Sequence, residues 1–192
     1  MNNSVIALAL LLSSISALAG PDRAQKPETG LAATPKSAVT KADSTKPINA
    51  LSWLVGGVWT TDASQLGPGM VRIETRYQWA DNHAFLRFNT HFVMKDSVNK
   101  NYDGNFFWNP ADSALALWYM DASNHITQGP VTMDGDNFQV TFSGTNFENK
   151  PANLRVTVTR KSADLYTWLL EEKLPDSWHQ MAKLDYARQT GE

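Results

Sequence analysis

Two adjacent glutamates, Glu171 and Glu172, are the strongest candidates for acid–base chemistry in this 192-residue chain. They lie in a segment that alternates apolar and polar residues, so on a strand they would point to opposite faces. Glu172 shares its parity with Tyr166 and Trp168, which makes it the best candidate for an inward carboxylate. Its position near the end of the segment favours exposure at a rim. An enzyme would need paired titratable groups inside a cavity, with Glu172 or Tyr77 as the proton carrier.

The four histidines do not form a metal-binding pattern. A metal site needs three or four converging ligands, and none of His83, His91, His125 and His179 lies within four residues of another. On one strand, His83 and His91 would be ~26 Å apart at about 3.3 Å per residue. His83 and His125 fall at turns, and His91 falls on a polar face. We therefore expect no metal site and no cofactor.

Motifs for nucleophilic and phosphate chemistry do not occur in the sequence. There is no G-x-S-x-G and no glycine-rich phosphate loop, and Gly67-Pro68-Gly69 indicates a turn. The chain has no cysteine, which excludes disulfides, thiolate ligands and a cysteine nucleophile. No catalytic residue is therefore assigned.

Aromatic and hydroxyl-bearing side chains are the best candidates for a ligand site. Taken singly, a large aromatic residue is generally a core residue. Hydroxyl groups set among apolar neighbours, however, are the usual make-up of a small-molecule pocket. The candidate ligand-binding residues are Thr75, Tyr77, Trp79, Phe88, Thr90, Trp108, Trp118, Tyr166, Trp168 and Tyr186.

These residues lie in short segments of period two, separated by turn signals at intervals of roughly 8–15 residues. The turns are rich in Asn, Asp, Gly and Pro, and Gln128-Gly129-Pro130 predicts a bulge or an edge. A short helix or 3₁₀ turn is expected over 48–55. The predicted strands are 57–64, 70–80, 84–94, 102–108, 114–120, 125–133, 137–144, 153–160, 165–172 and 178–188.

The alternation gives the expected sheet one apolar face and one polar face. In 70–80, Ile73, Tyr77 and Trp79 oppose Arg72 and Glu74. The same parity places Trp118 with Met120 on the apolar side of 114–120. One dry and one wet face are typical of antiparallel sheets. An even number of meandering strands lets the first pair with the last, so the sequence predicts a single all-β up-and-down barrel of about ten strands. Such a barrel is wider than one of eight strands, whose interior side chains just fill.

At this point the chain resembles the calycins, the superfamily of lipocalins and fatty-acid-binding proteins. The residues that carry the resemblance are Gly57-Val58-Trp59 in the first strand and Arg188 in the last. The resemblance implies that Trp59 closes the barrel base and that Arg188 packs over its indole. Leu-x-x-Gly-x-Trp and ten expected strands look closer to bacterial lipocalin-like families of unknown function and to nitrobindin-like ten-stranded barrels.

The nitrobindin-like resemblance gives His179 a second interpretation, because such barrels hold haem through a histidine near the C-terminus. Strict alternation groups His179 with Met181 and Lys183, opposite Leu184 and Tyr186. That parity points His179 outward, whereas axial ligation requires an inward donor.

The N-terminus indicates a secretory signal peptide over 1–19. An apolar run covers 5–12, and Ala17-Leu18-Ala19 before Gly20 is an A-x-A cleavage pattern. The run is shorter than the roughly 20 residues that a spanning helix needs. We therefore expect a periplasmic or secreted protein with no stable membrane anchor.

Residues 20–47 indicate a disordered tether rich in Pro, Ala and Lys, because they offer little apolar surface to bury. The tether carries a net charge of +2 by count and the whole chain carries −2, which leaves about −4 for the rest. This balance argues against a nucleic-acid partner. Residues 48–189 fit one lipocalin-like barrel domain, with 190–192 as a tail.

The leading hypothesis is a protein that binds a small apolar or aromatic molecule inside the barrel without catalysis. Three alternatives remain: an isomerase- or decarboxylase-type barrel enzyme with an inward Glu172 or Tyr77, haem binding through His179, and an interaction module whose barrel is filled. An exposed apolar patch on the outer wall would favour the last. The sequence does not name the ligand or the oligomeric state.

Overall fold

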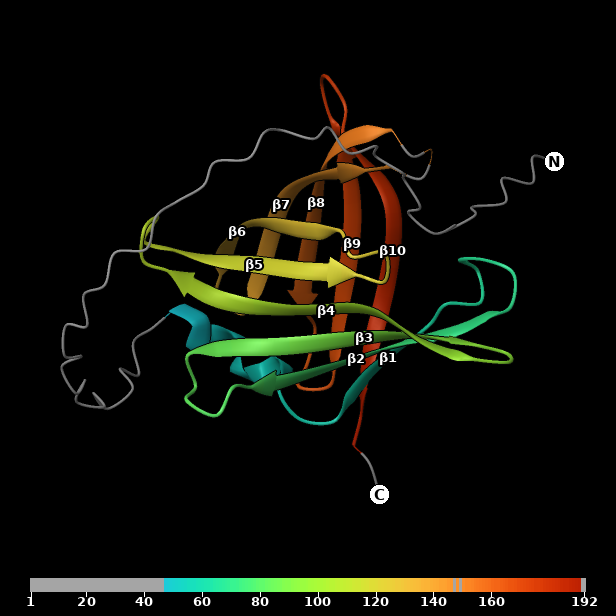
Figure 1. Ribbon diagram of the computed structural model, residues 1–192, viewed down its shortest axis with the longest axis horizontal. Helices are drawn as coiled ribbons and strands as arrows, with labels where there is room; N and C mark the ends of the chain where they lie inside the picture. The colour runs from blue at the N-terminus through green and yellow to red at the C-terminus, as the bar shows by residue number, and fades with distance from the viewer. Residues whose placement is uncertain (1–46, 147, 149, 191–192) are drawn as a thin grey trace, which may run out of the picture.

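The computed structural model describes residues 47–146, 148 and 150–190. A 3₁₀ helix, η1, precedes ten antiparallel strands that close into one barrel (Figure 1). The elements are η1 (Pro47–Leu54), β1 (Val58–Asp62), β2 (Met70–Trp79), β3 (Phe85–Met94), β4 (Val98–Asn109), β5 (Ala114–Asp121), β6 (Ile126–Asp134), β7 (Asn137–Thr145), β8 (Pro151–Arg160), β9 (Leu165–Lys173) and β10 (Trp178–Gln189).

Each strand pairs with its neighbours in sequence, and β1 closes the barrel by pairing with β10. The closing ladder joins Val58 to Gln189, Trp59 to Arg188 and Thr60 to Ala187. The expected all-β up-and-down barrel is therefore confirmed, and it is consistent with a calycin-like barrel. Closure leaves no strand of the described sheet without a partner on either side.

The strand bounds agree with the alternation in the sequence, with the largest difference at β4. This strand begins at Val98, four residues before the predicted start at 102. The register of β3 and β4 shifts between Thr90 and His91, which leaves Asn101 as an extra residue in β4. Such a bulge interrupts the period of two, so the polar residues before Tyr102 did not indicate a strand.

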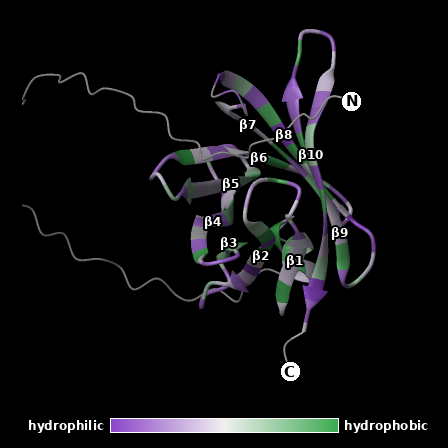
Figure 2. Ribbon diagram, turned by 90° about the vertical axis from the view of Figure 1, so that its right-hand side faces the viewer, coloured by the Kyte–Doolittle hydropathy of each residue, from purple (hydrophilic) through white to green (hydrophobic). Residues whose placement is uncertain are grey.

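The hydrophobic core lies on the inside of the barrel, and η1 covers one end of it. Ile48, Leu51 and Leu54 of η1 are at most 1% exposed, and η1 contacts β3 and β4. The expected helix or 3₁₀ turn at 48–55 is therefore confirmed. Figure 2 shows the alternation of hydrophobic and hydrophilic residues along the strands that supplies the rest of the core.

The wall between β6 and β7 is hydrogen-bonded over only part of its length. Their ladder runs from Val131–Val140 to the turn at Asp134–Asn137 and does not continue before Val131. Pro130 has no N–H to continue it, and a Cβ on Gly129 would lie 2.0 Å from the Thr141 carbonyl oxygen. The irregularity expected at Gln128-Gly129-Pro130 is thus located at the point where the two strands cease to pair.

The proposed signal peptide at 1–19 lies outside the described residues, as does the proposed tether up to residue 46. The tail expected at 190–192 is described only at Thr190.

Candidate functional site

Arg188 joins the barrel wall to η1. Its Nη1 donates hydrogen bonds to the carbonyl oxygens of Val55 and Gly56 at 2.7 Å each, and its Nη2 donates to that of Trp53. Its guanidinium carbon lies 4.3 Å from the ring centroid of Trp59, as the resemblance implied. The carbonyl groups at the C-terminal end of a helix have no helical partner and attract a cation. Arg188 therefore has a structural role.

Gly57 and Trp59 make this arrangement possible. Gly57 has φ 70°, and a Cβ there would lie 2.6 Å from the carbonyl oxygen of Gln189. Only glycine therefore lets the chain leave η1 so close to β10. Trp59 is fully buried, and its indole N–H donates to the Leu54 carbonyl oxygen at 2.7 Å.

Aromatic rings continue this packing into the interior. The rings of Trp53 and Trp59 meet edge to face at 5.8 Å, and Trp59 lies 4.7 Å from Tyr166. Tyr166 stacks on Tyr186 at 4.9 Å. We call Trp53, Trp59, Tyr166, Tyr186 and Arg188 the base. Burial and ring geometry at the base are those of a packed core rather than of a pocket.

All five tyrosines of the chain face the interior, including two that the sequence analysis did not select. The register aligns Tyr102 with Thr90 and Tyr119 with Gly104, and both rows belong to the inner face. The alternation of residues along each strand could have found both, in Tyr102-x-Gly104-x-Phe106 and in Leu115-x-Leu117-x-Tyr119. For Tyr119 this alternation was obscured because β5 is apolar on both faces.

Burial raises the pKa of every one of these tyrosines. The pKa of Tyr77 is raised to about 12, although its hydrogen bond to Tyr166 acts in the opposite direction. The pKa values of Tyr102, Tyr119, Tyr166 and Tyr186 are raised by the same cause. At neutral pH the interior therefore presents neutral hydroxyl groups, and Tyr77 is poorly suited to carry a proton.

Hydroxyl groups inside the barrel are paired with one another. The Oγ1 atoms of Thr75 and Thr90 lie 2.9 Å apart, and both residues are buried. Tyr186 hydrogen-bonds to Thr75, and Tyr119 to Thr127. These pairs satisfy polar groups that the apolar surroundings would otherwise penalise.

The structure brings all but one of the candidate ligand residues to the inner face. Thr75, Thr90, Tyr166 and Tyr186 are buried there. The others are partly exposed: Tyr77, Trp79, Phe88, Trp108 and Trp168.

The placement of Trp118 in the interior is wrong. Trp118 is in register with Asn105 and Gln128, whereas its neighbours Leu117 and Tyr119 take the inner positions. Leu117 is 7% exposed, which confirms the parity of β5. The error arose because Trp118-x-Met120 and Leu117-x-Tyr119 are both apolar, so hydrophobicity did not discriminate between the two faces.

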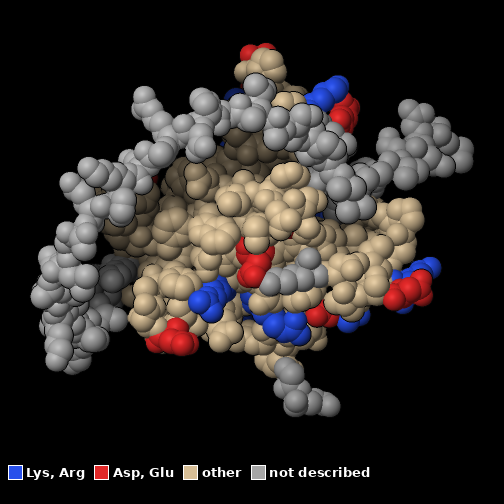
Figure 3. Space-filling model, viewed as in Figure 1, with Lys and Arg blue, Asp and Glu red and all other residues tan. Residues whose placement is uncertain are grey.

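At the end of the barrel opposite η1, the inner wall is apolar but partly open to solvent. Phe92, Tyr102 and Phe142 face inward by register, and each is partly exposed. These rings contact other inward rings, Phe92 with Tyr102 at 5.8 Å and Phe142 with Tyr119 at 6.4 Å. Figure 3 shows the surface hollowed between the front strands and the more distant β7 and β8, with uncharged residues on the part of the hollow in view.

His179 does not face outward, contrary to its parity in the sequence. The register of β9 and β10 shifts between Gln180 and Ala182, so that Met181 is an extra residue. The bulge places His179 opposite Glu172, and Glu172 pairs in turn with Leu154 on the inner face. A bulge reverses the facing of every residue beyond it.

Glu172 is on the inner face, as its parity predicted, and is half-buried. Its Oε1 accepts a hydrogen bond from the Asn146 amide at 2.9 Å. The described contacts of Glu172 include no tyrosine or arginine of the kind that the enzyme hypothesis requires. We call Phe92, Tyr102, Phe142, Glu172 and His179 the mouth.

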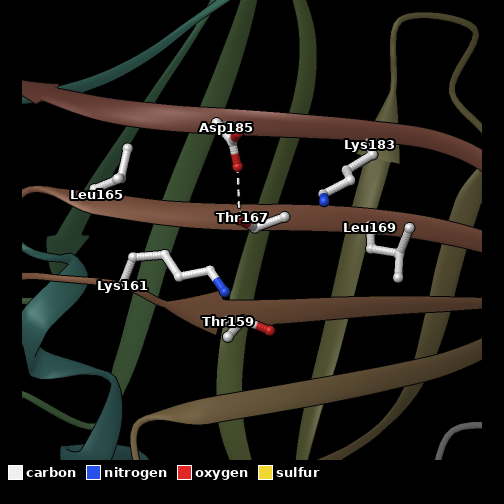
Figure 4. A pocket seen from close by; sticks show the side chains of 7 residues that line it. All are labelled: Thr159, Lys161, Leu165, Thr167, Leu169, Lys183 and Asp185. Atoms are coloured by element: carbon white, nitrogen blue, oxygen red, sulfur yellow. Dashed lines mark hydrogen bonds between the residues drawn. The ribbon is translucent and has the colours of Figure 1, made fainter.

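A groove of about 530 Å³ runs over the outer wall of β8, β9 and β10. The Thr167 hydroxyl donates to Asp185 at 2.6 Å on its floor, and Lys161 and Lys183 extend along it toward Thr167 (Figure 4). These residues alternate with the inward Tyr166 and Trp168. The groove is therefore separate from the barrel interior.

In the part of the chain that the structure describes, no three His, Asp or Glu side chains lie close enough together to hold a metal ion. No helical segment in the same ranges has the length and apolarity needed to cross a bilayer.

Comparison of the chain with protein-family models and with curated proteins finds no match.

Proposed function

We propose that this protein binds a small apolar or aromatic molecule in the open half of its barrel, without catalysis. One observation carries the proposal: three aromatic side chains point inward by register and are still partly exposed. They are Phe92, Tyr102 and Phe142. The fully buried aromatic ring of the inner wall, Trp59, lies at the base, whereas these three rings keep part of their surface exposed. When an apolar ligand covers apolar surface inside a protein, the water on that surface is released, which favours binding.

The base supports this proposal by closing the other end. Trp59 and Leu86 are fully buried there, so this end offers a ligand no route of entry. The paired hydroxyl groups of Thr75 and Thr90 add polar contacts deeper in the interior. A mostly apolar wall with few polar groups favours a hydrophobic ligand that makes one or two hydrogen bonds.

Fluorescence titration with N-phenyl-1-naphthylamine, a neutral apolar probe, tests the proposal. We expect saturable binding that Ala182→Phe weakens at least about tenfold, because Ala182 is on the inner face beside the mouth. Ala116→Phe is the matched control on the outer face of β5 and should leave the affinity unchanged. Equal affinity for the wild type and Ala182→Phe would place the probe elsewhere and refute the proposal.

The position of His179 favours a second candidate, haem binding. The bulge at Met181 directs its imidazole to the inner face, where an axial ligand would be required. Titration with haemin should then give a Soret band that His179→Ala removes and His83→Ala, at the turn after β2, does not. A Soret band that survives in His179→Ala would exclude this candidate.

We further propose that the protein works in the periplasm or outside the cell and is a lipocalin-like or nitrobindin-like barrel. The apolar run and A-x-A pattern of residues 1–19 support export, and the Arg188–Trp59 contact supports the family resemblance. N-terminal sequencing of the mature protein from its own host should begin at Gly20. A mature protein that begins at Met1 would contradict export by a cleaved signal.

A further inference from the structure

Glu172 is held in one orientation by the β7–β8 hairpin. The Asn146 Oδ1 accepts the backbone N–H groups of Glu148 and Lys150 at 3.0 and 3.1 Å. The amide nitrogen of Asn146 must therefore point the other way, where it donates to Glu172 Oε1 at 2.9 Å. The hairpin thus fixes one carboxylate oxygen and leaves Oε2 for another donor.

The neighbouring carboxylate, Glu171, has a different environment on the outer wall. Its Oε2 accepts from Arg155 Nε at 2.8 Å and forms an ion pair with Arg155 Nη2 at 2.7 Å. Within the described ranges, no cation lies within ion-pair distance of Glu172. Lys150 forms its ion pair with Glu148 at 2.6 Å, and the more distant charge of Glu172 also raises the pKa of Lys150.

Glu172 also stands beside the apolar lining of the mouth. It is in register with Leu154, which is 5% exposed, and Leu154 is in register with Phe142. A carboxylate that has no cation in ion-pair contact, with His179 opposite it in the β9–β10 ladder, offers a protonated amine two attractions at the edge of an aromatic wall. It accepts a charge-assisted hydrogen bond from a protonated nitrogen, and aromatic ring faces attract the same positive charge.

We propose that the mouth selects ligands that carry a protonated amine next to an apolar or aromatic body, with Glu172 as the anion that binds the amine. This inference rests on the proposed binding of small molecules inside the barrel and specifies their chemical class. Glu172 binds the head group, and Phe92, Tyr102 and Phe142 contact the body.

Isothermal titration calorimetry with three naphthalene probes tests the inference. The probes are 1-naphthylmethylamine, which is cationic, 1-naphthalenemethanol, which is neutral, and 1-naphthaleneacetate, which is anionic. The cation should bind the wild type about tenfold or more tightly than the neutral probe, since the ammonium adds the attraction of opposite charges to a hydrogen bond that the alcohol can also donate. The anion should bind more weakly than either.

Glu172→Gln keeps the shape of the side chain and should reduce the preference for the cation to about threefold or less, with the neutral probe unchanged. Glu171→Gln is the matched control, because it removes an adjacent negative charge from the outer wall. It should leave all three affinities unchanged.

The possible outcomes separate this inference from the proposed function. If the three probes bind the wild type equally, or if Glu171→Gln lowers the preference as much as Glu172→Gln, the selection of amines is refuted and interior binding stands. If the neutral probe fails to bind at all, interior binding of apolar molecules is itself refuted.

Discussion

The base and the mouth are built from the same alternating strands, yet they differ in what covers the inward side chains. At the base, Trp59 is fully buried and Tyr166 is 2% exposed. At the mouth, Phe92 and Phe142 also face inward but remain partly exposed. The difference is the presence of η1 and its attachment by Arg188 at one end only.

This comparison shows that barrel closure and barrel filling are separate properties. Closure is a matter of strand pairing and holds around the whole circumference. Burial of the inward side chains at an end takes an additional element across it, as η1 supplies at the base. The packed base supplies stability, and in the proposed function the mouth binds the ligand.

Replacement of Trp59 by alanine is the largest test of this division. We expect a loss of about 3–5 kcal/mol in the free energy of unfolding, because a large buried ring and its hydrogen bond to Leu54 are removed. Phe92→Ala at the mouth should lose roughly half of that or less, since part of its surface is already in water. Urea unfolding measures both. Equal losses would show that the two ends are packed alike.

Arg188→Met removes the guanidinium but keeps an apolar chain over Trp59. The carbonyl groups of Val55 and Gly56 would lose their donor, so we expect a loss of about 2–4 kcal/mol by urea unfolding. Arg87→Met is the control, since Arg87 is exposed and lies over Phe85 on the outer wall. Its effect should stay below about 0.5 kcal/mol. A similar effect of both variants would contradict the structural role of Arg188.

Gly57→Ala tests the close approach of η1 to β10. We expect a loss of about 2–3 kcal/mol in the free energy of unfolding, because an alanine Cβ would clash with the Gln189 carbonyl oxygen and because alanine disfavours the positive φ of this position. Gly135→Ala, in the turn after β6, has φ 58° but no atom within 4 Å of its Cβ, so its loss should be about 1 kcal/mol. Thermal unfolding measures the loss of stability in each variant, and the difference between the two losses is the cost of the contact with Gln189. Equal losses would show that this contact contributes nothing.

Alkaline pH should destabilise the protein through the five tyrosines of its inner wall. Their folded-state pKa values lie above the ordinary value of 10.0, with Tyr77 at about 12, so the unfolded chain releases its protons first. Stability is therefore complete below about pH 10 and falls as the pH rises toward the folded values, by about 1.4 kcal/mol per pH unit for each tyrosine. Urea unfolding with tyrosinate absorbance measures the loss.

Tyr186→Phe should reduce that alkaline loss, because it removes one buried hydroxyl of the base. Stability that stays constant from neutral pH to about pH 11 would show that the tyrosines are already accessible to water.

Much of the barrel could be predicted from local sequence. A strand in which one face is apolar and the other polar, such as β2, has a single interpretation, so the inward position of Tyr77 followed. In β5 the pattern failed, because Leu117 and Trp118 are both large and apolar. Only the neighbouring strands decided that Leu117, rather than Trp118, faces inward.

The sequence by itself determined the number of strands, the turns between them and the Gly-x-Trp at the base, since these depend on nearby residues. Tertiary structure alone decided where the register shifts. The bulge at Met181 turned His179 into the mouth beside Glu172, and the bulge at Asn101 extended β4. A bulge depends on how a strand fits its partners around a closed wall, and that fit has no local signature in the chain.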